Sequence, residues 1–150
     1  MASAVAGLFG HLIAMEWMMR ERLWIVVWVF GLLFISAEAM AGPVAQATKE
    51  SLLEVREHLI ALVAAQDEKS QAKRLVGIKS ATGKVDLQVS KNGELLKGFN
   101  AVWTLFKTTR DEKIIPLTMA GKKEEARYLA GGVQRDRMDK MLAILDTLTE

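Results

Sequence analysis

Apolar side chains recur at alternating steps of three and four residues in four successive stretches of the chain after Pro43. This spacing aligns them on one face of an α-helix, so each stretch predicts an amphipathic helix. The predicted inward positions, in chain order, are Leu52, Val55, Leu59, Leu62 and Gln66; then Leu75, Ile78, Thr82, Val85 and Val89; then Phe99, Trp103, Phe106, Ile114 and Leu117; and finally Leu129, Val133, Met138, Met141, Leu145 and Leu148.

Short polar segments at residues 67–70 and 91–93, and a tight reversal at the Ala-Gly pair 120–121, separate the four stretches. We therefore expect helices over about 44–66, 71–90, from the turn at 91–93 to about 120, and 122–148. Residues 85–89 alternate well enough for a short strand, but no other segment could pair with them. Long helices joined by short turns predict an all-α, up-down-up-down antiparallel four-helix bundle.

The segment from Trp103 to Arg127 predicts the third turn of this bundle in most detail. Gly121 suits the left-handed position that ends a helix, and the following Glu124 and Glu125 suit the positive end of the next helix dipole. Pro116 removes a backbone donor inside the preceding helix, so we expect a loosened turn near Ile115. The pair at 131–132, Gly-Gly, should loosen the early part of the fourth helix.

Three pieces of this segment also resemble a known family: the aromatic-bearing helix that ends Thr-Arg-Asp-Glu-Lys-Ile-Ile-Pro-Leu, the turn Ala-Gly-Lys, and the opening Glu-Glu-Ala-Arg. Their order and spacing resemble the junction of the third and fourth helices in the four-helix-bundle ligand-binding domain of bacterial methyl-accepting chemotaxis receptors. The resemblance extends over Val44 to Glu150, with Val-Arg-Glu-His-Leu at 55–59 similar to the first bundle helix.

This resemblance implies a non-catalytic sensor domain at 42–150, functioning as a homodimer that binds a small molecule or a partner protein. In the receptors, the bundle lies between two membrane helices and is followed by a cytoplasmic signalling coiled coil. The present sequence contains no second apolar span. We therefore expect a sensor that lacks its own cytoplasmic signalling module and passes its state to a membrane partner protein. A truncated receptor gene is the alternative.

The N-terminal part has the pattern of an export signal. Arg20 and Arg22 precede an apolar run at 23–37, and Ala39-x-Ala41 follows it, which predicts a signal peptide at 18–41 cleaved after Ala41. Residues 1–17 would then be an upstream extension. The alternative is an uncleaved hydrophobic helix that anchors the chain in the inner membrane. Both interpretations place the bundle outside the cytoplasm, in the periplasm of a bacterium, because the basic residues stay inside.

Composition excludes several classes of function. The net charge is only +2, and basic and acidic residues are interspersed, so no basic face points to nucleic acid. The chain has no cysteine, which excludes disulfides, thiolate catalysis and cysteine-ligated metals. It also lacks a nucleophile elbow, a phosphate-binding glycine loop and a plausible catalytic triad, so we expect no enzyme activity.

Two arginines are the candidate ligand-binding residues. Arg110 falls on the inward seam of the third helix, where its charge must pair with a carboxylate, reach solvent or meet an anionic ligand. Arg56 flanks the inward stripe of the first helix. The resemblance gives Arg56 its role, since receptors for amino acids grip ligand carboxylates with first-helix arginines at the dimer interface.

Other candidates have simpler explanations. Glu54 and His58 are four residues apart and could share a metal, but two ligands do not make a site, and a solvated surface pair explains them. The aromatic side chains of the third helix and the methionines at 138 and 141 are at core spacing, so we expect no cofactor. The rival to a sensor is a periplasmic structural or chaperone-like bundle that binds no small ligand.

Overall fold

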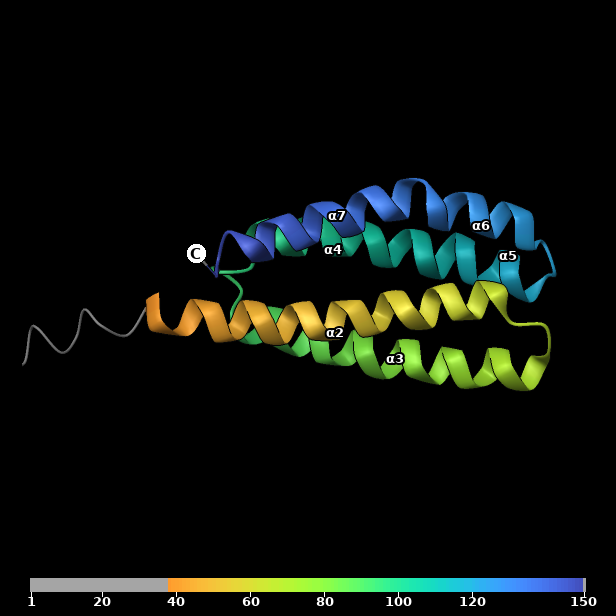
Figure 1. The fold of residues 1–150 in the computed structure, drawn as a ribbon, viewed down its shortest axis with the longest axis horizontal. Coiled ribbons are helices and arrows are strands. Elements are labelled where there is room, and N and C mark those ends of the chain that lie inside the picture. Colours follow the sequence, from red (N-terminus) through yellow and green to blue (C-terminus); the bar gives the residue numbers. More distant parts are fainter. Residues whose placement is uncertain (1–37, 150) are drawn as a thin grey trace, which may run out of the picture. The chain divides into compact units, whose positions relative to one another are not determined.

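The computed structural model describes residues 38–149, and every regular element in that range is helical. Residues 40–150 form one compact unit, in which four helical segments lie side by side (Figure 1). The predicted all-α class is thus confirmed for the described residues, and residues 85–89 are helical. The expectations for residues 1–17, and for most of the 18–41 signal or anchor segment, lie outside the described range.

The first described helix, α2, spans Glu38–Ala64 and continues through Pro43. It therefore starts at least six residues before the predicted start at residue 44. Pro43 cannot donate to the carbonyl four residues earlier, but this loss falls near the beginning of the described helix. The buried face of α2 is the predicted one, with Leu52, Val55, Leu59 and Leu62 in the core and Gln66 outside the helix and exposed.

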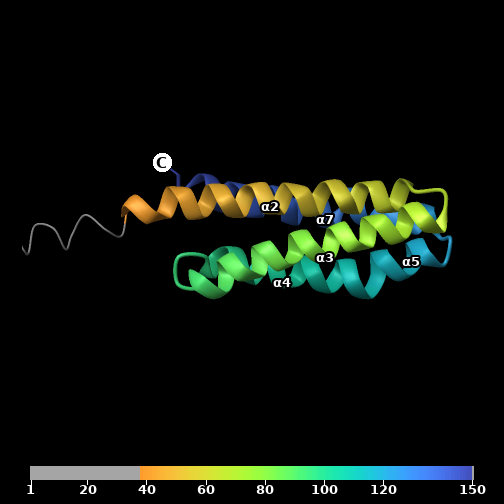
Figure 2. The same cartoon turned by 90° about the horizontal axis from the view of Figure 1, so that it is seen from below.

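The second helix, α3, spans Glu68–Lys91 and lies beside α2 (Figure 2). The carboxylate of Asp67 caps it by accepting a hydrogen bond from the backbone N–H of Ser70 at 2.9 Å. This hydrogen bond holds the pKa of Asp67 below its usual value of 3.8. The polar segment predicted as a turn at 67–70 is therefore mostly the first turn of the helix.

The third helical segment consists of three parts: α4 (Lys97–Thr109), a π-helical turn η1 (Arg110–Ile114) and α5 (Ile115–Met119). In η1 the backbone N–H of Ile115 donates to the carbonyl of Arg110, five residues back. A proline ring in a regular helix clashes with the carbonyl four residues earlier. The wider π turn just before Pro116 is the loosened turn that the sequence predicts, displaced toward Arg110.

The turn after α5 has the predicted left-handed glycine, with Gly121 at φ 75°. The N–H of Lys122 donates to the carbonyl of Leu117 at 2.9 Å, and the N–H of Gly121 donates to that of Thr118 at 3.1 Å. These two bonds form a Schellman cap. The fourth segment follows as α6 (Lys123–Gly131), with Glu124 and Glu125 in its first turn, and α7 (Val133–Asp146).

The core lies between the four segments. Its largest side chains are the aromatics of α4: the rings of Phe99 and Trp103 stack with centroids 6.2 Å apart, and those of Trp103 and Phe106 with centroids 5.6 Å apart. Met138, Met141 and Leu145 of α7 are buried as predicted. Val133 is exposed instead, because the break at Gly132 changes the phase of the helix that carries it.

Ion pairs join neighbouring segments across the surface. Lys84 of α3 pairs with Glu54 of α2 at 2.7 Å, Lys107 of α4 with Asp86 of α3 at 2.7 Å, and Lys49 of α2 with Asp146 of α7 at 2.6 Å. Within residues 38–149, no helix combines the length and the apolar character that a membrane span requires.

Candidate functional site

A cavity of about 380 Å³ lies between α2, α4 and the α6–α7 segment. This volume is within the usual range for small-molecule sites, about 300–1,000 Å³. The lining residues come from the C-terminal half of α2, from α4 and from both sides of the α6–α7 break: Arg56, Leu59, Ile60, Val63, Ala64, Phe106, Arg127, Ala130, Gly131, Gln134, Arg135 and Met138.

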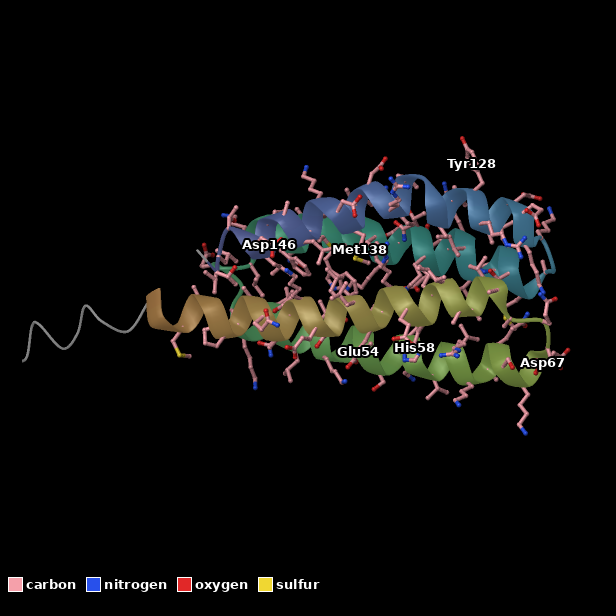
Figure 3. All side chains as sticks on the ribbon, viewed as in Figure 1. Glu54, His58, Asp67, Tyr128, Met138 and Asp146 are labelled. Atoms are coloured by element: carbon pink, nitrogen blue, oxygen red, sulfur yellow. The ribbon has the colours of Figure 1, made fainter. Side chains whose placement is uncertain are left out.

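The floor of this cavity is apolar. Leu59, Val63, Phe106 and Met138 are all buried and belong to the core. Figure 3 shows the Met138 side chain directed toward the space between α7 and α2, whereas Tyr128 points away from the helices. A ligand entering the cavity would therefore meet hydrocarbon and sulfur at its inner end.

The one polar side chain on the floor, Gln134, is already satisfied. Its amide nitrogen donates to the carbonyl oxygen of Phe106 at 2.9 Å, and its amide oxygen accepts from Nη1 of Arg137 at 3.1 Å. Because both ends of the amide have partners, Gln134 has little capacity left for a polar ligand. Its hydrogen bond to Phe106 instead holds α7 against α4 at the back of the cavity.

Three arginines stand at the rim, and they differ in their partners. Arg127 pairs with Glu124 one turn earlier, and Nε of Arg135 lies 4.0 Å from Oδ2 of Asp139. Arg56 is exposed and has neither an ion pair nor a hydrogen bond to any residue in the described range. Two of the three rim arginines therefore have an exposed carboxylate within 4.0 Å, whereas Arg56 has no ion pair in the described range.

The second predicted arginine, Arg110, has a different environment. Only 3% of its surface is exposed. Its Nε and Nη2 donate to the two carboxylate oxygens of Asp111 at 2.6 and 3.0 Å, and its Nη1 donates to Oγ1 of Thr82 at 2.7 Å. The guanidinium carbon lies 5.8 Å from the centroid of the Trp103 ring, which adds a cation–π contact.

The structure thus gives Arg110 the carboxylate partner that a buried arginine requires. Arg110 also lines a second, more open cavity of about 430 Å³, which lies between α3 and the π-helical turn and is also lined by Thr82, Asp86 and Asp111. The two predicted arginines line separate cavities, and the fold does not bring them together. A ligand role for Arg110 stays a prediction.

Sequence reasoning missed Asp86, which organises the polar side of this second cavity. Its Oδ1 accepts hydrogen bonds from Nε1 of Trp103 and from Nζ of Lys107, both at 2.7 Å. Lys107 also lies over the Trp103 ring, 5.5 Å from its centroid. Trp103 and Lys107 are one helical turn apart, which indicates that they share a face of the helix. This spacing does not identify Asp86 as their partner on α3.

Glu54 and His58 do not form the solvated surface pair that the sequence predicts, because they contact different residues of α3 and the His58 ring is partly buried. Glu54 pairs with Lys84, and the His58 ring lies against Gly77 of α3, where a Cβ atom would come within 2.5 Å of Nε2. Nδ1 of His58 is buried without a hydrogen-bond partner in the described part of the chain. No group of three or more potential ligands for a metal ion occurs among residues 38–149.

Comparisons with protein-family models, with curated protein sequences and with solved structures gave no match.

Proposed function

We propose that this chain is a non-catalytic sensor module, an exported helical bundle that binds a small molecule between its first and fourth helical segments. The observation that carries the proposal is the cavity between α2 and α6–α7, with the unpartnered Arg56 at its rim. An uncompensated guanidinium beside an apolar floor is an arrangement that favours an anionic ligand. The resemblance to chemotaxis-receptor sensor domains involves the same two helices, but in those receptors the ligand lies between two subunits.

The proposed topology is an up-down-up-down antiparallel bundle. Short connections at 65–67, 92–96 and 120–122 and the ion pairs of α2 with α3, α3 with α4, and α2 with α7 support it. We further propose that two copies associate, as in the receptors, and that ligand binding biases a small shift between packed arrangements of the first and fourth helices. A separate membrane protein would receive that shift.

Localisation is part of the proposal. Export rests on the basic, apolar and small-residue pattern of residues 18–41, with the mature protein either released after Ala41 or held by the apolar segment in the inner membrane. Sequencing the amino terminus of the protein recovered from cells separates these forms. A terminus at Gly42 indicates release, and an intact segment in the membrane fraction indicates an anchor. Recovery of the intact chain in the cytosol contradicts export.

A thermal-shift screen of the full-length protein tests ligand binding. The panel contains amino acids, dicarboxylates, aliphatic monocarboxylates and divalent metals. A ligand at one hundred times its dissociation constant should stabilise the protein by about 2.7 kcal/mol. At the same ligand concentration the Arg56→Ala variant should lose about half of that stabilisation, whereas Arg74→Ala should keep it, because Arg74 of α3 lines neither cavity. A flat response across the whole panel, identical in both variants, contradicts the sensor function.

A flat response would favour the structural or chaperone-like bundle. One observation supports that rival: several large apolar side chains are exposed, among them Val76 at 70% and Leu87 at 51% on α3. These two are eleven residues apart and therefore share a face of the helix. A protein partner that covers this face, with no small ligand involved, is the function that this observation favours.

A further inference from the structure

The charged rim and the apolar floor of the cavity between α2 and α6–α7 define a class of ligand. We infer that it binds an amphiphilic monocarboxylate, with an aliphatic tail on the apolar floor and the carboxylate on Arg56. This inference rests on the function proposed above, because it concerns the same cavity. It adds the charge, the polarity and the orientation of the ligand.

The arginine side chains at the rim of the cavity determine the charge of the ligand. Arg127 pairs with Glu124, and Asp139 lies 4.0 Å from Arg135, so Arg56 is the rim arginine that has no carboxylate partner in the described range. A single guanidinium matches a single carboxylate, with which it can form two parallel hydrogen bonds. A ligand with two or three negative charges would leave at least one of them without a partner at this rim.

The side chains of the cavity floor determine the polarity of the inner end of the ligand. Leu59, Val63, Phe106 and Met138 offer no hydrogen-bonding group, and the amide of Gln134 is occupied by Phe106 and Arg137. A hydroxyl, amide or second carboxylate at the inner end of a ligand would lose its water without replacement. Sugars, dicarboxylates and polar amino acids are therefore poor occupants, and a hydrocarbon tail is a good one.

The positions of Arg56 and of the apolar floor determine the orientation of the ligand. Arg56 lies on the exposed side of α2, one turn before the buried Leu59, so the charged end faces solvent and the apolar end faces the core. A carboxylate at the rim stays hydrated in part. The tail then displaces only the water over apolar side chains, which is the favourable part of the binding reaction.

Calorimetric titration of the full-length protein with a homologous series tests the inference. The series is acetate, butanoate, hexanoate and octanoate, with octanol and octylamine as matched ligands that have the same tail and a neutral or a positive head. Each added methylene should lower the dissociation constant about three- to fourfold until the cavity is full. Octanol and octylamine should bind at least tenfold more weakly than octanoate.

Two variants locate the binding. Arg56→Ala should weaken octanoate about tenfold and leave octanol unchanged, whereas Arg74→Ala should change neither. Ala130→Phe places a ring in the cavity from the α6 side and should abolish the dependence on tail length. Circular dichroism of each variant shows that it is folded. If Ala130→Phe does not fold, the series of tails and heads on the unmodified protein still decides.

The outcomes separate this inference from the function on which it rests. If amino acids, dicarboxylates or metals bind with dependence on Arg56 and octanoate does not, the ligand class is wrong and the sensor function stands. Equal binding of octanoate and octylamine contradicts the role of Arg56, and binding that Ala130→Phe leaves unchanged contradicts the cavity. If nothing binds, both the inference and the sensor function are wrong.

Discussion

Arg110 and Arg56 lie in surroundings that differ in packing, in hydrogen bonding and in access to water. Arg110 is buried in η1, donates three hydrogen bonds to Asp111 and Thr82, and makes a cation–π contact with Trp103. Arg56 is exposed in the C-terminal half of α2 and has no ion-pair or hydrogen-bond partner in the described range. A buried charge must be paired for the protein to fold, whereas an exposed charge costs nothing to leave free.

The role of a charged residue near a core depends on whether the protein itself uses its hydrogen-bonding capacity. The arginine on the inward seam has its hydrogen-bonding capacity largely used by the protein itself, so its removal should be felt as instability. The arginine at the edge of the apolar stripe retains its full capacity for a ligand. Substitution by alanine should therefore lower the stability of the protein at Arg110 and weaken ligand binding at Arg56.

The largest effect is expected for Arg110→Ala. The substitution removes two charge-assisted hydrogen bonds to Asp111, one to Thr82 and the contact with Trp103. Because Asp111 is half-exposed, we discount the ion pair for solvent screening and expect a loss of about 2–3 kcal/mol of unfolding free energy. Urea unfolding followed by circular dichroism measures it.

Arg56→Ala is the matched control and should change the unfolding free energy by no more than about 0.5 kcal/mol. Arg110→Met keeps the apolar stem and should recover part of the loss. Equal stability of the two alanine variants contradicts the distinction between a structural and a free arginine.

Trp103→Phe should cost about 1–2 kcal/mol. The phenylalanine ring keeps most of the stacking with Phe99 and Phe106 but cannot donate to Asp86, which then retains only Lys107 as a partner. Urea unfolding of Trp103→Phe, Asp86→Asn and the double variant measures the coupling between the two side chains. Additive effects contradict the hydrogen bond between Trp103 and Asp86 as a source of stability.

Much of this arrangement could be predicted from the sequence, because helices and turns depend on local patterns. The steps of three and four residues indicated four helical segments, and Gly121 and Pro116 marked the turn and the loosened helix. Non-local features could not be predicted. Asp86 and Trp103 are seventeen residues apart, and no periodicity connects them.

The cavity beside Arg56 was likewise beyond prediction, since it depends on how far α2 and α6–α7 stand apart. Its lining needs side chains from three segments of the chain at once. The phase error at Val133 has a local cause: the sequence showed that the glycine pair would loosen the helix, but it did not show how far the axis would turn at Gly132.

The open packing beside Arg56 predicts that a glycine there tolerates a side chain. A Cβ atom on Gly131 would meet nothing within 4 Å, and its φ is not positive, so Gly131→Ala should stabilise the protein by about 0.5–1 kcal/mol. Gly77 of α3 is the contrasting position, because a Cβ atom there would collide with the His58 ring.

Gly77→Ala should therefore destabilise the protein, and the added substitution His58→Ala should remove that penalty. Thermal unfolding of the variants shows the two signs. Destabilisation by Gly131→Ala means that the region beside Arg56 is packed more tightly than the structure indicates.

The smallest effect concerns Asp67, the residue that caps α3, which lies outside both regions. Its folded pKa is below the usual 3.8, because the N–H of Ser70 bonds to the charged carboxylate. A lowered pKa means that the stabilisation is fully present above the unfolded pKa and is lost as pH falls through the folded one. The loss therefore falls below pH 3.8.

The substitution Asp67→Asn caps the helix with an uncharged amide at every pH. Unfolding free energies of both proteins between pH 5 and pH 2, measured in urea, should run in parallel near pH 5 and separate only in the acid range, with the unmodified protein losing more. Separation of the two curves already near pH 5 contradicts the lowered pKa of Asp67.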